Sequence, residues 1–141
     1  MVRVIMHGCN GKMGQVISRL AAEDEELCIV AGVDARDDGH NEYPVFTDIR
    51  ECNVEADALI DFSAAPAVDG MLAYCVEKNL PCVLCTTGLT QEQLAKAEEA
   101  AGKIAVLRSA NMSMGINLLL KLLKDAAGIL APAGFDIGCV C

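Results

Sequence analysis

Hydrophobic and polar positions follow two different periods along this 141-residue chain. Short runs rich in β-branched residues are followed by turn residues, and then by stretches in which apolar residues recur every three or four positions. The runs predict strands and the stretches predict helices. Because strands that alternate with helices are typical of a parallel sheet covered by helices, the chain is predicted to be an α/β protein.

The same pattern places the individual elements. Strands are predicted at residues 2–6, 27–33, 45–47, 56–61, 81–85, 104–107 and 135–140. Helices are predicted after the first strand, with apolar positions from Met13 to Ala21, then after Ser63, at 90–101 and at 113–130. Ser63 is expected to cap the second helix, and Thr90 with Gln93 has the spacing of a capping box.

Two helices differ in their apolar pattern. In the first, one face carries Met13, Val16, Ile17, Leu20 and Ala21. In the helix at 113–130, leucines surround the axis and leave little polar face. This last helix is therefore expected to need cover on more than one side, and a homo-oligomer would provide it.

Composition and charge narrow the possible functions. Lys and Arg number 11 against 20 Asp and Glu, a net charge of −9, which argues against binding to a nucleic-acid backbone. Hydrophobic residues make up 53% of the chain, enough for a folded core. No stretch approaches the roughly 20 apolar residues of a membrane span, and residues 1–6 do not resemble a signal peptide. We therefore expect a cytoplasmic protein that contacts neither membrane nor nucleic acid.

Eight cysteines are present, mostly within apolar runs. They are expected to be buried free thiols, because free cysteine is among the most buried residue types. Cys82 and Cys85 have the spacing of a CxxC motif, but no second pair completes a zinc site. The sequence therefore predicts no metal centre.

A glycine-rich segment lies between the first strand and the first helix. Gly8 would allow a tight turn, Gly11 a close approach of the backbone to a pyrophosphate, and Gly14 close packing of helix on strand. Asp34 follows the second strand about 20 residues after the last of these glycines, where a carboxylate accepts hydrogen bonds from the adenosine ribose. These residues predict a Rossmann-type, doubly wound sheet that binds a dinucleotide.

The residues around Asp34 bear on the choice between NADH and NADPH. A carboxylate repels a 2′-phosphate, whereas Arg36, two residues later, can pair with one. Lys12 can also reach the phosphates. We therefore expect NADH to be accepted at least as well as NADPH.

Three further segments follow predicted strands, at residues 61–63, 85–88 and 109–113. All contain small or hydroxylated residues at the edge where open α/β sheets bind ligands. They are candidates for contacting the nicotinamide and its ribose. Helix caps and turns are the alternative interpretation, because Ser, Thr and Asn favour those positions.

These segments together resemble the dihydrodipicolinate reductases, also called 4-hydroxy-tetrahydrodipicolinate reductases. The glycine loop, Asp61-Phe62-Ser63, Thr86-Thr87-Gly88 and above all the Asn-Met-Ser-Met-Gly-Ile-Asn segment at 111–117 carry the resemblance, which extends over residues 1–137. It implies a cytoplasmic, NAD(P)H-dependent enzyme of the diaminopimelate route to lysine. Such enzymes are usually homotetramers that reduce a cyclic dicarboxylate imine.

The resemblance also implies which residues hold the cofactor. These are Gly8, Cys9, Asn10, Gly11, Lys12, Met13, Asp34, Phe62, Cys85, Thr86, Thr87, Ser109, Ala110, Asn111 and Met112. The glycine loop would hold the pyrophosphate and Asp34 the adenosine ribose. Thr86, Thr87 and residues 109–112 would line the nicotinamide end.

The chain departs from the family pattern at two places. Cys85 stands where the family usually has glycine, and after Ile137 the His-His and lysine segment that binds substrate and supplies a proton is missing. We therefore expect a dinucleotide-binding domain at 1–130 and the start of a substrate domain at 131–141. No catalytic residue is assigned, and the chain alone is expected to be inactive.

Neither histidine replaces the missing proton donor. His7 is expected to pack or to bond the backbone, and His40 to be solvated. Two other functions remain open at this point. One is a non-catalytic nucleotide-binding or assembly module that pairs with another chain, and the other is a different Rossmann dehydrogenase, such as a homoserine or sugar dehydrogenase.

Overall fold

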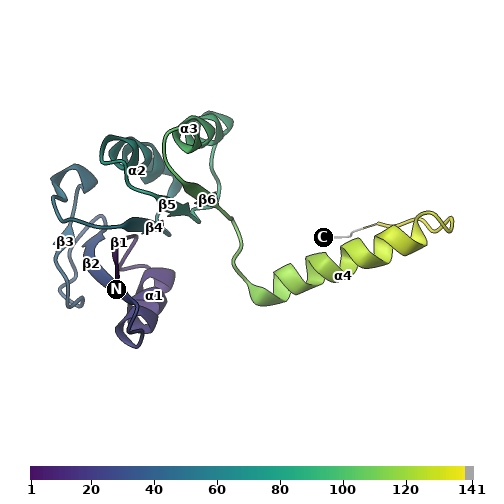
Figure 1. Ribbon diagram of the computed structural model, residues 1–141, viewed down its shortest axis with the longest axis horizontal. Coiled ribbons are helices and arrows are strands. Elements are labelled where there is room, and N and C mark those ends of the chain that lie inside the picture. Colours follow the sequence, from purple (N-terminus) through teal and green to yellow (C-terminus); the bar gives the residue numbers. More distant parts are fainter. Residues whose placement is uncertain (139–141) are drawn as a thin grey trace. The chain divides into compact units, whose positions relative to one another are not determined.

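Six parallel strands form a single sheet in the computed structural model, which describes residues 1–138 (Figure 1). In chain order the elements are β1 (Val2–His7), α1 (Lys12–Ala22), β2 (Leu27–Val33), β3 (Val45–Phe46), the 3₁₀ helix η1 (Ile49–Glu51), β4 (Ala58–Asp61), α2 (Ala65–Glu77), β5 (Cys82–Leu84), α3 (Gln91–Ala101), β6 (Val106–Arg108) and α4 (Met114–Leu130). The strand order is β3-β2-β1-β4-β5-β6, so the sheet extends in both directions from β1. This order confirms the predicted Rossmann-type fold.

The chain divides into two compact units, Met1–Ala110 and Asn111–Cys141. The first unit contains the sheet with α1, α2 and α3, and the second contains α4. Among the described residues, no helix is both long and apolar enough to span a bilayer. The domain boundary expected at residue 130 stays a prediction.

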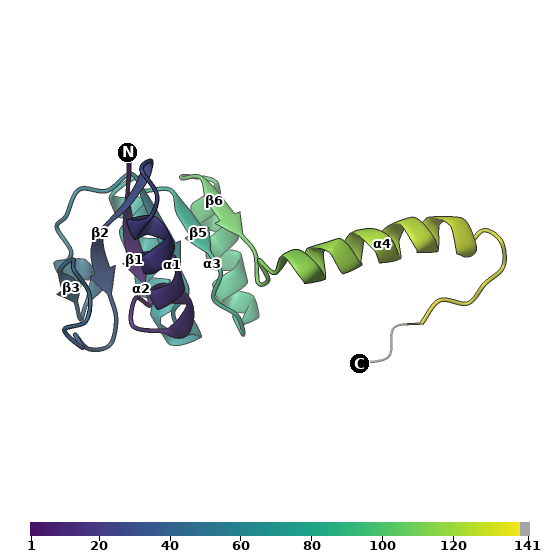
Figure 2. The same cartoon turned by 90° about the horizontal axis from the view of Figure 1, so that it is seen from below.

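Helices cover both faces of the sheet in the first unit. Helices α2 and α3 lie on one face, and α1 lies on the other (Figures 1 and 2). The main core lies under α2 and α3, where Ile5, Leu59 and Leu84 from the strands meet Val68 and Met71 from α2. All five side chains are fully buried. Alternate residues of a strand share a face of the sheet, so these core residues fix the face to which each other side chain of β1, β4 and β5 points.

Helix α1 packs through a different face from the apolar one seen in the sequence. Ala21 is buried, but Met13, Val16 and Leu20 are exposed. The helix is positioned by small and polar contacts instead. Gly14 packs on the glycine loop, and the Ser18 hydroxyl lies 2.6 Å from the Tyr43 hydroxyl.

The helix starts were predicted with mixed success. The Thr90 and Gln93 capping box is confirmed, and the Gln93 side chain also donates to the Ala65 carbonyl of α2 at 2.6 Å. The expected Ser63 cap is wrong, because Ala64 occupies the N-cap of α2 and no side chain caps it. Ser63 instead uses its backbone N–H to bond Asp61, which places it beside the end of β4.

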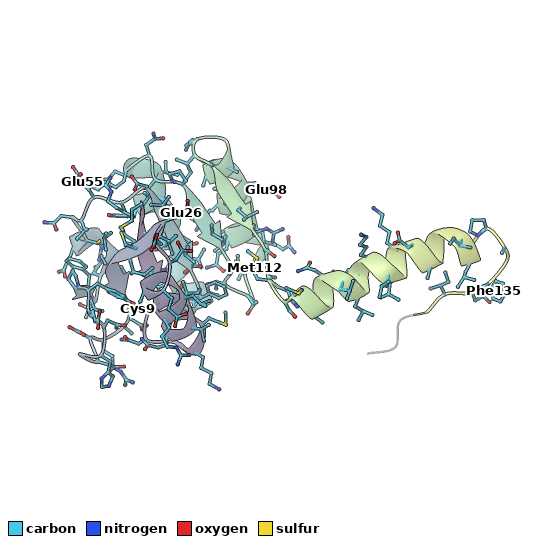
Figure 3. All side chains as sticks on the ribbon, turned by 60° about the horizontal axis from the view of Figure 1, so that its bottom comes forward. Cys9, Glu26, Glu55, Glu98, Met112 and Phe135 are labelled. Carbon is cyan, nitrogen blue, oxygen red and sulfur yellow. The ribbon has the colours of Figure 1, made fainter. Side chains whose placement is uncertain are left out.

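The second unit consists mainly of α4, whose first turn is capped by the Ser113 hydroxyl. Within the described residues, no side chain of α4 is buried, and Figure 3 shows side chains on several sides of this helix. The strand expected at 135–140 is wrong for Phe135–Gly138, which form no regular element. Residues 139–140 of that prediction lie outside the described residues.

Candidate dinucleotide-binding site

A cavity of about 790 Å³ opens at the carboxyl ends of β1, β2 and β4. It is lined by His7, Gly8, Asn10, Gly11, Val33, Asp34, Ala35, Arg36, Asp38, Thr47, Asp48, Ile49, Arg50, Phe62, Ser63, Ala64, Pro66, Ala67 and Gly70. The strand order reverses between β1 and β4, and ligands of open α/β sheets bind outside the strand ends at such a point. The cavity therefore lies where a dinucleotide is expected.

Gly8 and Gly14 are required by the packing of the glycine loop, whereas the role of Gly11 beside a pyrophosphate stays a prediction. Gly8 has a φ of +82°, and a Cβ there would lie 2.5 Å from the Phe62 carbonyl oxygen. A Cβ on Gly14 would collide with the backbone of Gly8 and Cys9. These close approaches bring the start of α1 against the ends of β1 and β4.

Helix α1 begins at Lys12, directly after the loop, and no side chain caps it. The first N–H groups of a helix have no intrahelical partner, and the helix dipole adds positive potential at this end. An anion is therefore favoured beside Gly11, which precedes the helix and lines the cavity. Lys12 and Met13 lie in this first turn and are exposed, but they do not line the cavity.

Asp34 joins the loop to the end of β2. Its Oδ2 accepts a hydrogen bond from the Asn10 backbone N–H at 2.8 Å, and its Oδ1 accepts one from the Ala35 N–H at 2.8 Å. A carboxylate has about four acceptor positions, so both oxygens can still accept from a ligand. The backbone bonds thus fix a carboxylate at the cavity wall in the position predicted for ribose recognition.

Two arginines line the outer part of the cavity, and each is paired with an aspartate. Arg36 Nε lies 2.7 Å from Asp38 Oδ1, and Arg50 binds Asp48 through its guanidinium. The hydrogen bonds from Arg50 lower the pKa of Asp48 to about 2. Sequence reasoning missed residues 47–50, because they lie in the bend after β3 and in the start of η1, whose place beside the cavity follows only from the sheet order.

Cys9 supports the loop from inside the first unit, where Figure 3 labels it. The residue is fully buried, and its side chain packs against Gly32 of β2. Burial, together with the charge of Asp34, raises the pKa of Cys9 to about 11. The six described cysteines are free thiols, and in the described part of the chain no three potential ligand side chains are placed to hold a metal.

A buried polar network lies behind the cavity. The register pairs His7 of β1 with Asp61 of β4, and His7 Nδ1 lies 2.7 Å from Asp61 Oδ1. The Thr86 hydroxyl donates to Asp61 Oδ2 at 2.7 Å. His7 was expected to pack or to bond the backbone. It bonds a carboxylate instead, because parallel pairing brings together two strand ends that are distant in the sequence.

The residues expected at the nicotinamide end lie at the neighbouring strands. Cys85 and Thr86 are buried after β5, Thr87 is exposed, and the Ser109 N–H donates to the Leu84 carbonyl at 3.1 Å. Neither these residues nor Ala110 line the cavity, and Asn111 and Met112 belong to the second unit. Of the predicted site residues, the cavity brings together Gly8, Asn10, Gly11, Asp34 and Phe62. The cofactor roles of all the predicted residues stay predictions.

Sequence relatives and a family model both match this chain to the dihydrodipicolinate reductases. The family model for the N-terminus of dihydrodipicolinate reductase matches residues 2–112. A 4-hydroxy-tetrahydrodipicolinate reductase from Caldanaerobacter subterraneus subsp. tengcongensis is 47% identical over 137 residues, which is 97% of this chain and 53% of the relative. The chain spans about half the length of the curated relatives it matches.

Two solved structures are similar to this fold. One is a dipicolinate-bound dihydrodipicolinate reductase from Paenisporosarcina sp. TG-14, with a TM-score of 0.76 and 28% identity, covering 92% of this chain and 54% of that one. The other is a myo-inositol 2-dehydrogenase from Lactobacillus plantarum, with a TM-score of 0.69 and 16% identity, covering 91% and 42%. The second likeness shows the shared fold alone.

Proposed function

The chain belongs to the dihydrodipicolinate reductase family, and on this premise we propose that it binds NADH or NADPH as the cofactor-binding part of a 4-hydroxy-tetrahydrodipicolinate reductase. One observation carries the proposal. The cavity at the reversal of strand order is bordered both by the glycine loop and by the anchored carboxylate of Asp34. Other Rossmann dehydrogenases share the fold, but the family match favours this reductase over them.

The residues present fit a dinucleotide. The backbone at Gly8 and Gly11 leaves no side chain between the loop and a diphosphate, and the uncapped start of α1 favours its negative charge. Asp34 would accept hydrogen bonds from the adenosine ribose. When bound, the nicotinamide ring supplies hydride to the substrate. The contribution of this chain is to bind and orient the cofactor.

The acidic and basic groups near the ribose support dual use of the cofactors. Asp34 disfavours a 2′-phosphate, whereas the Arg36 side chain is 80% exposed and forms its ion pair with Asp38 at the surface, so its guanidinium can turn toward one. We therefore propose that NADH binds at least as tightly as NADPH.

Substrate binding and proton donation are proposed to need residues that the relatives carry beyond the matched half. On this view the 141-residue chain alone binds cofactor without turnover, and the complete enzyme reduces a cyclic dicarboxylate imine in the diaminopimelate route to lysine. We further propose a cytoplasmic location and a homo-oligomer. The dinucleotide-binding domain would extend to residue 130, and residues 131–141 would begin the substrate domain.

Titration of the 141-residue chain with NADH and NADPH tests this proposal. We expect a micromolar Kd for NADH, and in Asp34→Asn NADH binding weaker by about tenfold to a hundredfold with NADPH affected less, since a hydrogen bond to a charged group contributes about 1.5–3 kcal/mol. Asp24→Asn, which removes an exposed carboxylate far from the cavity lining, is the matched control.

Three outcomes would contradict parts of the proposal. A folded chain that binds neither cofactor would refute the cofactor site, and capture of a tight partner chain by the same protein would favour the assembly module. A hundredfold preference for NADPH would refute the proposed cofactor choice. Substrate-dependent loss of NADH with the 141-residue chain alone would refute the need for further residues.

A further inference from the structure

Three buried polar side chains form a network beside the cavity, and two of them, His7 and Asp61, have no role in the cofactor site described so far. Thr86 is 6% exposed, His7 is 5% exposed and Asp61 is fully buried. They are joined by two short hydrogen bonds of 2.7 Å, both to the carboxylate of Asp61. The network thus connects the ends of β1 and β4 with the residues after β5.

Asp61 holds a buried negative charge in this network. Burial raises the pKa of Asp61, but hydrogen bonds from His7, the Ser63 N–H and the Thr86 hydroxyl together outweigh burial and hold the pKa below its ordinary value. The Thr86 hydroxyl donates its only proton here. Asp61 is therefore ionised at neutral pH, and its negative charge repels an anion that approaches the glycine loop.

His7 lines the cavity, and its two ring nitrogens differ in their contacts. Nδ1 makes the contact with Asp61, and within residues 1–138 no hydrogen bond involves Nε2. In the same part of the chain, no buried side-chain nitrogen or oxygen lacks a partner. Nε2 is therefore not fully enclosed, and His7 lines the cavity.

Among the described residues that line the cavity, both cations are paired with aspartates, so an entering diphosphate meets no cation that is free of an ion pair. Asp61 of β4 contacts His7 directly, and the other charged groups that share the cavity lining with His7 are Asp34, Arg36, Asp38, Asp48 and Arg50. The Cys9 thiol lies in the neighbouring glycine loop, and the Cys85 thiol lies after β5, where the charge of Asp61 raises its pKa. Both arginines of this wall are already ion-paired with aspartates. A protonated His7 would cancel the charge of Asp61 and offer an N–H to the ligand.

We propose that His7 is a further cofactor-binding residue, oriented by Asp61 through Nδ1, which takes up a proton from solvent as its Nε2 contacts the diphosphate of the bound dinucleotide. The inference rests on the proposed cofactor site. Protonation converts Nε2 into a donor, and an anion beside it stabilises the charged ring. Because binding takes up a proton, cofactor affinity falls as pH rises.

Calorimetric titration of the 141-residue chain with NADH and with ADP-ribose tests this inference. Each titration is run at several pH values from 6 to 8.5, in two buffers with different ionisation enthalpies. The difference in heat between the buffers gives the number of protons taken up. We expect uptake of a fraction of a proton with both ligands, and a Kd that rises by at most about tenfold per pH unit.

Variants of the two histidines separate a ligand contact from a structural role. His7→Asn keeps an amide donor for Asp61, whereas His7→Gln places its amide closer to the position of Nε2. Both are expected to abolish proton uptake and flatten the pH dependence, and Gln is expected to retain more affinity than Asn at pH 8.5. His40→Gln removes the other histidine of the chain and should leave proton uptake unchanged.

The outcomes distinguish this inference from the proposed function. If the wild-type chain binds NADH without proton uptake, or if uptake persists in a folded His7 variant, His7 does not have this role while the cofactor site stands. Uptake with NADH but none with ADP-ribose would refute a contact with the diphosphate. If no cofactor binds at any pH, the proposed function itself fails. The wild-type proton count decides the question even where a variant does not fold.

Discussion

At the scale of single residues, the site depends on small groups whose importance comes from their surroundings. In the sequence, Asp34 is one acidic residue at the start of a loop. In the structure, the backbone N–H groups of Asn10 and Ala35 hold its carboxylate beside the glycine loop. Gly14 is one of several glycines that lie in helices. At Gly14 the backbone of Gly8 and Cys9 occupies the space that a Cβ would need, whereas the space at Gly70 is open. Residue type and tertiary contact together determine both roles.

Gly14→Ala tests the close packing of α1 on the loop. The added Cβ would meet backbone atoms of Gly8 and Cys9, which cannot turn away as a flexible side chain can. We expect a loss of about 1–3 kcal/mol in the free energy of unfolding, typical of overpacking, together with weaker NADH binding. Urea unfolding followed by circular dichroism measures the first effect.

Gly70→Ala is the matched control for stability. Gly70 also lies within a helix of the first unit, but nothing lies within 4 Å of a Cβ built there. Alanine is favoured over glycine by up to about 1 kcal/mol in a helix interior, so this variant should be as stable as the wild type or more stable. Equal destabilisation of both variants would mean that the close contact at Gly14 is not the cause.

At the scale of elements, the helices differ in how their N-termini are satisfied. Helices α1 and α2, whose starts border the cavity, have no side-chain cap, whereas Thr90 caps α3 and Ser113 caps α4. A side-chain cap satisfies one of the N–H groups that a ligand would otherwise use. The two uncapped starts therefore favour an anionic ligand at the cavity.

The pairing of β1 with β4 is reinforced by an ion pair at the amino end of the strands. Arg3 binds Asp57 through its guanidinium at 2.8 Å, and its hydrogen bonds lower the pKa of Asp57 to about 2 from an ordinary 3.8. A carboxyl with a depressed folded pKa binds fewer protons than in the unfolded chain. It therefore stabilises the fold above about pH 4, and this stability is lost as pH falls toward 2.

Arg3→Met is expected to make the stability less dependent on pH between 4 and 2. Without the guanidinium, the pKa of Asp57 returns toward its unfolded value, so protonation no longer favours the unfolded chain at this position. Urea midpoints at pH 5, 4, 3 and 2.5 measure the change. Arg19→Met removes an equal charge from α1, outside the ion pairs of the described chain, and should leave the wild-type slope. An unchanged slope in Arg3→Met would contradict the prediction.

At the scale of the whole molecule, the two units bury apolar surface very differently. The first unit holds the core beneath α2 and α3, whereas no described residue of α4 is buried. Helix α4 carries exposed leucines on several sides, including Leu118, Leu119 and Leu122. Apolar surface of this extent on one helix is typical of an interaction site.

We expect the 141-residue chain to self-associate through α4. Sedimentation equilibrium should give a weight-average mass that rises with protein concentration. The double variant Leu119→Lys with Leu123→Lys places two charges one helical turn apart and should shift the chain toward monomer, whereas Lys121→Gln on the same helix should not. A wild-type chain that stays monomeric at all concentrations would refute this prediction.

Much of the fold could be predicted because the signals are local. The alternation of strand and helix, the glycine loop and the Thr90 capping box each depend on residues a few positions apart. The buried face of α1 was predicted less well. Its apolar residues lie on one side, but Gly14 packs on the glycine loop and Ser18 bonds the distant Tyr43, so that much of the apolar side stays exposed.

The sequence by itself therefore determined the Rossmann-type fold, the position of the glycine loop and the carboxylate of Asp34, because periodicity and turn chemistry act over short distances. Only the tertiary structure decided that His7 meets Asp61 and that residues 47–50 line the cavity. Both depend on strand order and register, which are set when the whole sheet packs and not by any local segment.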